Sequence, residues 1–277
     1  HWMVRRQRQM CIRDRLSLAL GDWKAGEEWN KKSQVELKSW NEYVDKESAP
    51  SNQEVPSYVQ VIGAIYKNSD PSDIAVTAAG GLVGEVIQVW RPRELNTHET
   101  EWGFSCMSYE ISGALGIKMA NPDKEVISFV GDGSYLLNNT DIYSSVITNN
   151  KLIIIVCDNG GFAVINRLQL FKGGNEYNNL LKSSNTPGLV DIDFAKHAES
   201  MGAKSEHVSS ISDLEEAFKR AKKSKVTYVI SIKTHAYQWL EGSAFWDSPT
   251  LEVPTTKENK EALRLYKEGK SKQRQGV

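Results

Sequence analysis

The sequence has 277 residues, enough for one large domain or two small ones, and its formal net charge is −1 at neutral pH. Apolar residues make up 40% and charged residues 25%, and no apolar run approaches the roughly 20 residues that cross a bilayer. These values argue against nucleic-acid and membrane partners. Three scattered cysteines do not predict a disulfide framework, so we expect a reducing, cytoplasmic location.

Residues 1–15, HWMVRRQRQMCIRDR, differ in composition from the rest of the chain and contain five arginines and one aspartate. A basic arm for nucleic acid is one interpretation. The run MCIRDR, however, resembles a translated sequencing adapter, so we predict that residues 1–15 are a foreign, artefactual segment with no part in the fold. We therefore expect the chain to be a fragment that lacks its natural N-terminal part.

Residues 16–55 are predicted to form a helical connector followed by a linker. The first part carries Trp23, Trp29 and Trp40 among charged residues, a pattern typical of a helix whose tryptophans dock on another surface. The polar run KESAPSNQEV at 46–55 has the composition of a linker and predicts a domain boundary.

Residues 56–240 alternate between helix-like and strand-like segments and are predicted to form one domain. The expected strands are the apolar runs at 73–81, 125–130, 152–161 and 226–234. The expected helices lie at 55–68, 108–120, 136–149, 191–202 and 212–223. This alternation predicts an α/β fold, with a parallel sheet and helices on both faces. Residues 241–277 are expected to form a C-terminal tail with a solvated helix.

Three of the predicted strands end in small or polar residues. These endings are AAGG at 78–81, GDGS at 131–134 and DNGG at 158–161. In parallel α/β sheets, ligands bind beyond the carboxyl ends of the strands. The three endings together therefore predict one shared ligand site.

The GDGS ending allows two interpretations. Asp-Gly is common in tight turns, and a turn alone would explain the glycines. Alternatively, Gly131 and Gly133 let the backbone approach a phosphate, and the amides of Gly133 and Ser134 would face it from a helix N-terminus. Asp132 would repel phosphate at that place unless a divalent cation such as Mg²⁺ lay between them.

The DNGG ending supplies further ligands for such a cation. Asn159 offers a side-chain oxygen and Gly161 a backbone carbonyl. With Asp132, two phosphate oxygens and a water, they would complete the octahedron that Mg²⁺ prefers. The predicted metal ligands are therefore Asp132, Asn159 and Gly161.

Gly131-Asp132-Gly133, followed after 25 residues by Asn159, resembles the motif of the thiamin-diphosphate-dependent enzymes. In that family, GDG and a later pair of asparagines hold Mg²⁺ and the diphosphate of the cofactor. This chain departs from the pattern because Asp158 replaces the usual first asparagine, which leaves the role of that position open. The resemblance implies the thiamin-diphosphate-binding fold, with thiamin diphosphate and Mg²⁺ as cofactors.

A second block, at 103–116, resembles the segment of the family that precedes GDG. In it a bulky apolar residue wedges between the two rings of the cofactor, and Met107 matches this position. Met107 alone would be read as ordinary core. Gly80 and Gly81 match the loop near the diphosphate, although a plain strand-end turn also explains them. The cofactor-binding residues implied are Gly80, Gly81, Met107, Gly131, Asp132, Gly133, Ser134, Asn159 and Gly161.

The activating glutamate of the family lies on a separate pyrimidine-binding domain, usually that of a neighbouring subunit. That domain precedes the present one, and we expect it to be missing here, so no residue is assigned as catalytic. The resemblance implies that this fragment is inactive alone. It also implies a homodimer or homotetramer, in which the partner is a pyrimidine-binding domain of the same or a neighbouring subunit.

The segments at 105–120, 165–169, 178–181 and 190–203 resemble one branch of the family, which opens a cyclic trihydroxy-1,2-diketone by C–C hydrolysis in inositol catabolism. Such a polyol diketone substrate needs many hydrogen-bond partners. The candidates are His98, Asn166, Arg167 and Gln169, although a solvated loop or helix surface would account for each. Trp239 and Trp246 could cover the site or pack against the connector.

Two alternatives stay open. Acetolactate synthases and pyruvate oxidase-like decarboxylases use the same cofactor on pyruvate, so the same motifs would fit them. The chain could also be a non-catalytic module that binds Mg²⁺ and the diphosphate, because we expect the activating glutamate to be absent.

Overall fold

The structure is a computed structural model that describes residues 12–51, 53–101, 103–186, 188, 190–241 and 250–273. The chain divides into two compact units, with the boundary between Tyr43 and Val44. In the first unit, residues 12–20 and most of α2 (Glu27–Glu47) are helical, and Trp23 and Trp29 are exposed. The domain limits expected at residues 15, 55 and 240 stay predictions.

The described part of the second unit contains a sheet of six parallel strands in the order β2-β1-β3-β4-β6-β5. The strands are β1 (Ile74–Thr77), β2 (His98–Thr100), β3 (Val126–Gly131), β4 (Ile153–Asp158), β5 (Lys204–Val208) and β6 (Tyr228–Lys233). The predicted parallel α/β sheet is confirmed, and the four predicted strands are four of these six. β2 and β5, at the two edges, were not predicted.

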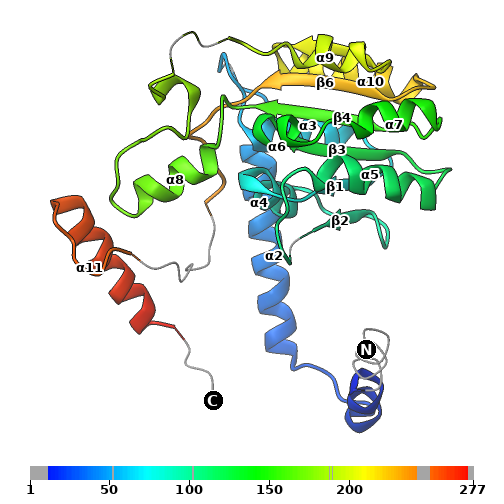
Figure 1. Cartoon of the computed structure of the whole chain (residues 1–277). Coiled ribbons are helices and arrows are strands. Elements are labelled where there is room, and N and C mark those ends of the chain that lie inside the picture. Colours follow the sequence, from blue (N-terminus) through cyan, green and yellow to red (C-terminus); the bar gives the residue numbers. More distant parts are fainter. Residues whose placement is uncertain are drawn as a thin grey trace. The chain divides into compact units, whose positions relative to one another are not determined.

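Helices cover both faces of this sheet (Figure 1). The helices described in this unit are α3 (Tyr58–Asn68), α4 (Gly80–Val89), α5 (Tyr109–Ala120), α6 (Asp132–Leu137), α7 (Asp141–Ile147), α8 (Ala163–Phe171), α9 (Phe194–Ser200), α10 (Ile211–Lys223) and α11 (Lys257–Ser271), and α8 packs against α4. On one face, α5, α7 and α9 contribute Ile111, Ile142 and Phe194 to the core. On the other lie α3, α4 and α10, and Trp90 after α4 packs edge-on against Phe129 at 5.9 Å. Among the described residues, no helix has both the length and the apolar character needed to cross a membrane.

The helix predicted at 136–149 is wrong, because this region forms two helices. α6 begins at Asp132, so the GDGS stretch itself opens a helix, and the chain leaves helical geometry before α7. Asn138 is extended there, its amide donates to the hydroxyl of Ser112 at 3.2 Å, and it accepts from the hydroxyl of Thr140 at 2.9 Å. Short polar side chains of this kind compete with helical hydrogen bonding, which explains the break.

β4 lies at the centre of the core and carries the DNGG loop at its carboxyl end. All six residues of the strand are buried, as expected for a strand covered on both faces. Ile153, Ile154 and Ile155 are fully buried, and each contributes roughly 1.5–3 kcal/mol of hydrophobic stabilisation. The DNGG loop therefore follows directly on a strand that is packed on both faces.

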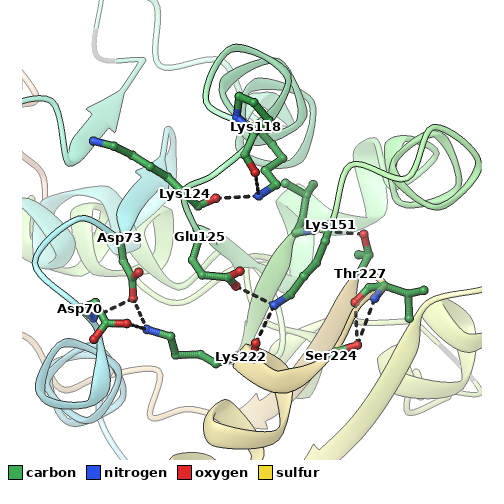
Figure 2. A network of polar contacts seen from close by, with 12 residues as sticks. Asp70, Asp73, Lys118, Lys124, Glu125, Lys151, Lys222, Ser224 and Thr227 are labelled. Carbon is green, nitrogen blue, oxygen red and sulfur yellow. Dashed lines mark hydrogen bonds and ion pairs between the residues drawn. The ribbon is translucent and has the colours of Figure 1, made fainter.

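A polar network joins the strands at their amino ends, opposite the GDGS and DNGG endings (Figure 2). Lys222, at the end of α10, pairs with Asp70 and with Asp73, whose Oδ2 lies 2.8 Å from the ammonium nitrogen. Lys151 pairs with Glu125 at 2.8 Å and donates to the carbonyl of Lys222 at 3.0 Å. Because these residues precede β1, β3 and β4, the network holds the three strands in register at one end.

Candidate functional site

The carboxyl ends of β1, β3 and β4 are neighbours in the sheet, and the loops after them surround one small cavity. Its volume is about 40 Å³, room for a few atoms the size of a water oxygen. A larger cavity of about 320 Å³ also has Asp132 and Asn159 in its wall. All nine predicted cofactor-binding residues line the smaller cavity: Gly80, Gly81, Met107, Gly131, Asp132, Gly133, Ser134, Asn159 and Gly161.

The GDGS and DNGG loops are joined directly. Asp132 Oδ2 accepts a hydrogen bond of 2.7 Å from the backbone N–H of Gly161. A glycine at 133 permits this approach, because a Cβ there would lie 2.6 Å from the ring of Phe162. At Gly161, where φ is +138°, a Cβ would lie 2.5 Å from the carbonyl oxygen of Asn179. Both glycines are therefore needed to bring the two loops together.

Asp132 is a buried carboxylate in a negative environment. It is 5% exposed, and burial together with the nearby charge of Asp158 raises the pKa of its carboxyl to about 7. Among the described residues no basic side chain pairs with Asp132. Lys233, at the end of β6, pairs with Asp158 instead, at 2.7 Å. A bound divalent cation would favour the ionised carboxylate and reverse this shift.

Asn159 presents an unpaired oxygen. Its side-chain NH₂ group donates to the hydroxyl of Tyr58, at the start of α3. Its Oδ1 is buried and accepts no hydrogen bond from any described residue. A buried polar atom without a partner is costly, and such atoms often mark the place of a ligand.

Asp158, where the family has its first asparagine, has a structural role that accounts for the departure. Its Oδ1 accepts from the backbone N–H of Gly160 at 2.9 Å, which closes the loop on itself. Its Oδ2 pairs with Lys233 at the end of β6. The extra negative charge is thus balanced by a lysine on the neighbouring strand.

These residues fit a hard cation. Within the described parts of the chain, no three His, Cys, Asp or Glu side chains gather to hold a metal. A metal here would instead use mixed oxygen ligands, namely the carboxylate of Asp132, the unpaired amide oxygen of Asn159 and the carbonyl of Gly161. Carboxylate, amide and carbonyl oxygens are the ligands that Mg²⁺ accepts in proteins.

Glu110 is a residue of the site that sequence reasoning missed. It is 1% exposed, accepts from the backbone N–H of Ala79 at 3.2 Å and accepts from the hydroxyl of Ser134 at 2.8 Å. Ser134 in turn accepts from the N–H of Ser108, beside Met107, at 2.6 Å. One buried acid thus connects the β1 loop, the GDGS loop and the Met107 segment. The feature of the sequence that could have revealed Glu110 is that a single acidic residue stands among the small and apolar residues of 109–117.

The comparison with protein families agrees with this geometry. Residues 78–232, more than half of the chain, match the family described as thiamine pyrophosphate enzyme, C-terminal TPP binding domain. The chain belongs to the thiamine pyrophosphate enzymes. Thiamine pyrophosphate is another name for thiamin diphosphate, so the predicted family is confirmed. The β1, GDGS and DNGG loops all lie within the matched span.

Several curated proteins with the name 3D-(3,5/4)-trihydroxycyclohexane-1,2-dione hydrolase resemble this chain. The protein of Bacillus licheniformis is 34% identical over 82% of this chain, and that of Shouchella clausii 35% over 81%. The protein of Bacillus cereus strain AH820 is 38% identical over 74%. The chain spans about a third of the length of these relatives, 34%, 34% and 32% respectively.

Two solved thiamin-diphosphate enzymes share the fold. The 4-hydroxybenzoylformate decarboxylase of Rhodococcus jostii RHA1 matches with a TM-score of 0.58 at 22% identity, over 68% of this chain and 34% of that one. The benzoylformate decarboxylase of Polynucleobacter necessarius matches with a TM-score of 0.53 at 22% identity, over 64% and 32%. At this identity they confirm the thiamin-diphosphate-binding fold and carry no information about substrate.

Trp239 packs beside two residues of the cofactor cavity, although it does not line that cavity itself. A Cβ at Gly81 would lie 2.4 Å from its ring, and the ring of Tyr58 meets it edge-on at 6.0 Å. The guanidinium of Arg167 lies 4.8 Å from the centre of the Trp239 ring. Trp239 therefore packs against cofactor-site residues, whereas Trp246 lies outside the described residues.

The four predicted substrate residues are placed differently. Arg167 lines a cavity of about 660 Å³ together with Trp239. Asn166 is buried and donates to Glu176 at 2.8 Å, and Gln169 accepts from Asn179 at 2.6 Å, so both hold the loop after α8. His98, at the start of β2, does not line the cofactor cavity. Substrate contact by any of them stays a prediction.

Proposed function

We propose that this chain is the diphosphate- and Mg²⁺-binding part of a thiamin-diphosphate-dependent hydrolase that opens a cyclic trihydroxy-1,2-diketone in inositol catabolism. The observation that carries the metal and cofactor part is the shared cavity, which is lined by Asp132, with its buried carboxylate, and by Asn159, with its unpaired oxygen. The common name of the relatives supports the substrate.

When bound, thiamin diphosphate supplies a carbanion that adds to a carbonyl and an electron sink for cleavage of the neighbouring C–C bond. The chain contributes the anchoring. Asp132, Asn159 and Gly161 would hold Mg²⁺, and the backbone amides at the start of α6 would face the diphosphate. Met107, half-buried at the cavity wall, is suited to hold the cofactor rings apart.

The whole enzyme requires a partner in this proposal. The activating glutamate would come from a pyrimidine-binding domain of the same or a neighbouring subunit, in a cytoplasmic homodimer or homotetramer. The chain would therefore bind its ligand but be inactive alone.

A chimera tests the proposal. Residues 16–277 replace the corresponding third of the Bacillus licheniformis relative, and opening of the cyclic diketone is followed with thiamin diphosphate and Mg²⁺. We expect turnover, and we expect its loss in the Asp132→Asn chimera. Turnover of pyruvate with none of the diketone would refute the substrate, and a folded chimera without Mg²⁺-dependent cofactor binding would refute the site.

A further inference from the structure

Tyr58 lies in the cofactor cavity although it belongs to none of the three strand-end loops. It is the first residue of α3, is 3% exposed, and lines the cavity together with Asp132 and Asn159. Its hydroxyl accepts a hydrogen bond from the side-chain NH₂ group of Asn159. A residue 101 positions earlier in the chain thus contacts the asparagine that faces the cavity.

The position of Tyr58 is fixed from two sides. Ser57 and Gln60 form a capping box at the start of α3, with hydrogen bonds of 3.0 and 3.3 Å between side chains and backbone. Gln60 also donates to the carbonyl of Ala49 at 2.9 Å. The ring of Trp239 packs against the Tyr58 ring. The hydroxyl is therefore held at a defined place rather than on a mobile side chain.

The hydrogen bond decides which end of the Asn159 amide faces the cavity. An amide has an oxygen that accepts and an NH₂ group that donates, and only the oxygen can bind a cation. With the NH₂ group engaged by Tyr58, Oδ1 is left buried and unpaired. Rotation of the amide by half a turn would direct its NH₂ group at the cation and prevent coordination.

We propose that Tyr58 is a positioning residue that orients the amide of Asn159, so that its oxygen faces the metal-binding cavity. This inference rests on the proposed function, in which Asn159 is a ligand of Mg²⁺. It deepens that proposal by adding a residue from α3, outside the family motif, on which the affinity for the metal depends.

Tyr58→Phe keeps the ring on Trp239 and removes the hydroxyl. With the chain and saturating thiamin diphosphate, we titrate Mg²⁺ by calorimetry and expect roughly 10- to 100-fold weaker Mg²⁺ binding, the usual effect of losing such an orienting contact. Tyr228→Phe is the matched control, because Tyr228 is also buried and donates its hydroxyl to Glu206, in β5, outside the cavity lining. Its affinity for Mg²⁺ should match that of the parent.

A second parent variant, Asn159→Asp, distinguishes an orienting role of Tyr58 from a general loosening of the site. Asn159→Asp gives a side chain with two oxygens, so either end can face the cation. In that background Tyr58→Phe should weaken Mg²⁺ binding far less than in the parent, whereas a purely structural role predicts the same loss in both. Equal loss in both, or parent-like affinity of Tyr58→Phe, overturns the inference while the proposed function stands. Absence of Mg²⁺ binding by the parent chain overturns both.

Discussion

Asp132→Asn should make the metal-free protein more stable at neutral pH while it removes metal binding. The amide has nearly the same shape as the carboxyl, and its Oδ1 can still accept from the N–H of Gly161, which lies 2.7 Å from Asp132 Oδ2. What changes is the charge. The parent must carry a buried carboxylate that no cation among the described residues neutralises, whereas the variant carries a neutral group.

The magnitude follows from the pKa of Asp132. In the folded protein it is about 7, against 3.8 for an ordinary aspartate, so the folded state keeps a proton that the unfolded state has lost. Each pH unit of this difference is worth about 1.4 kcal/mol. The stabilisation is complete below pH 3.8 and is lost as the pH rises through about 7, a total of about 4 kcal/mol. From pH 5 to 7 the parent should lose about 2.3 kcal/mol that the variant keeps, because the carboxyl is already half ionised at pH 7.

Urea denaturation followed by circular dichroism between pH 5 and 8, without metal, measures this difference. Asp123→Asn, which removes an exposed carboxylate after α5, is the matched control and should track the parent at every pH. Adding Mg²⁺ and thiamin diphosphate should stabilise the parent and leave Asp132→Asn unchanged, because ligands stabilise only a state that binds them. A difference between parent and variant that does not vary with pH would falsify this account of Asp132.

Three further substitutions test other parts of the structure. Lys222→Met leaves the buried carboxylate of Asp73 without its cation, so we expect unfolding to become easier by about 3 kcal/mol, measured with urea. Glu110→Gln places an NH₂ group against one of two hydrogen-bond donors, and the same assay should show a loss of roughly 1–3 kcal/mol; parent-like stability would mean that the loops do not depend on this acid. Gly161→Ala combines φ of +138° with a backbone oxygen 2.5 Å from the new Cβ, so calorimetry should detect no Mg²⁺-dependent cofactor binding, and normal binding would contradict the loop geometry.

The sheet and the strand-end loops could be predicted because their signals are local. Apolar runs such as 152–161 mark strands buried on both faces, and glycines with an acid or amide mark the turn into the next helix. The edge strands β2 and β5 were missed for the opposite reason. One face or edge of each is exposed, so HET and KSEHV lack an apolar run.

The sequence predicted those residues of the site that belong to recognisable motifs. The nine predicted residues meet in one cavity because parallel strands bring their carboxyl ends to one edge. Tyr58 and Glu110 were missed because each lies in a helix that resembles ordinary core, and their partners are distant in sequence. Asn166 and Gln169 were predicted to contact substrate. Their side chains instead form hydrogen bonds with Glu176 and Asn179, which hold the loop after α8.

The central claim is that the loops after β1, β3 and β4 hold Mg²⁺ and the diphosphate of thiamin diphosphate. Isothermal titration of the chain with thiamin diphosphate, in the presence of Mg²⁺ and then of a chelator, tests it most directly. We predict one binding site per chain with Mg²⁺, none with the chelator, and none for Asp132→Asn in either condition. Equal binding with and without the metal, or no binding to the chain at all, would contradict the claim.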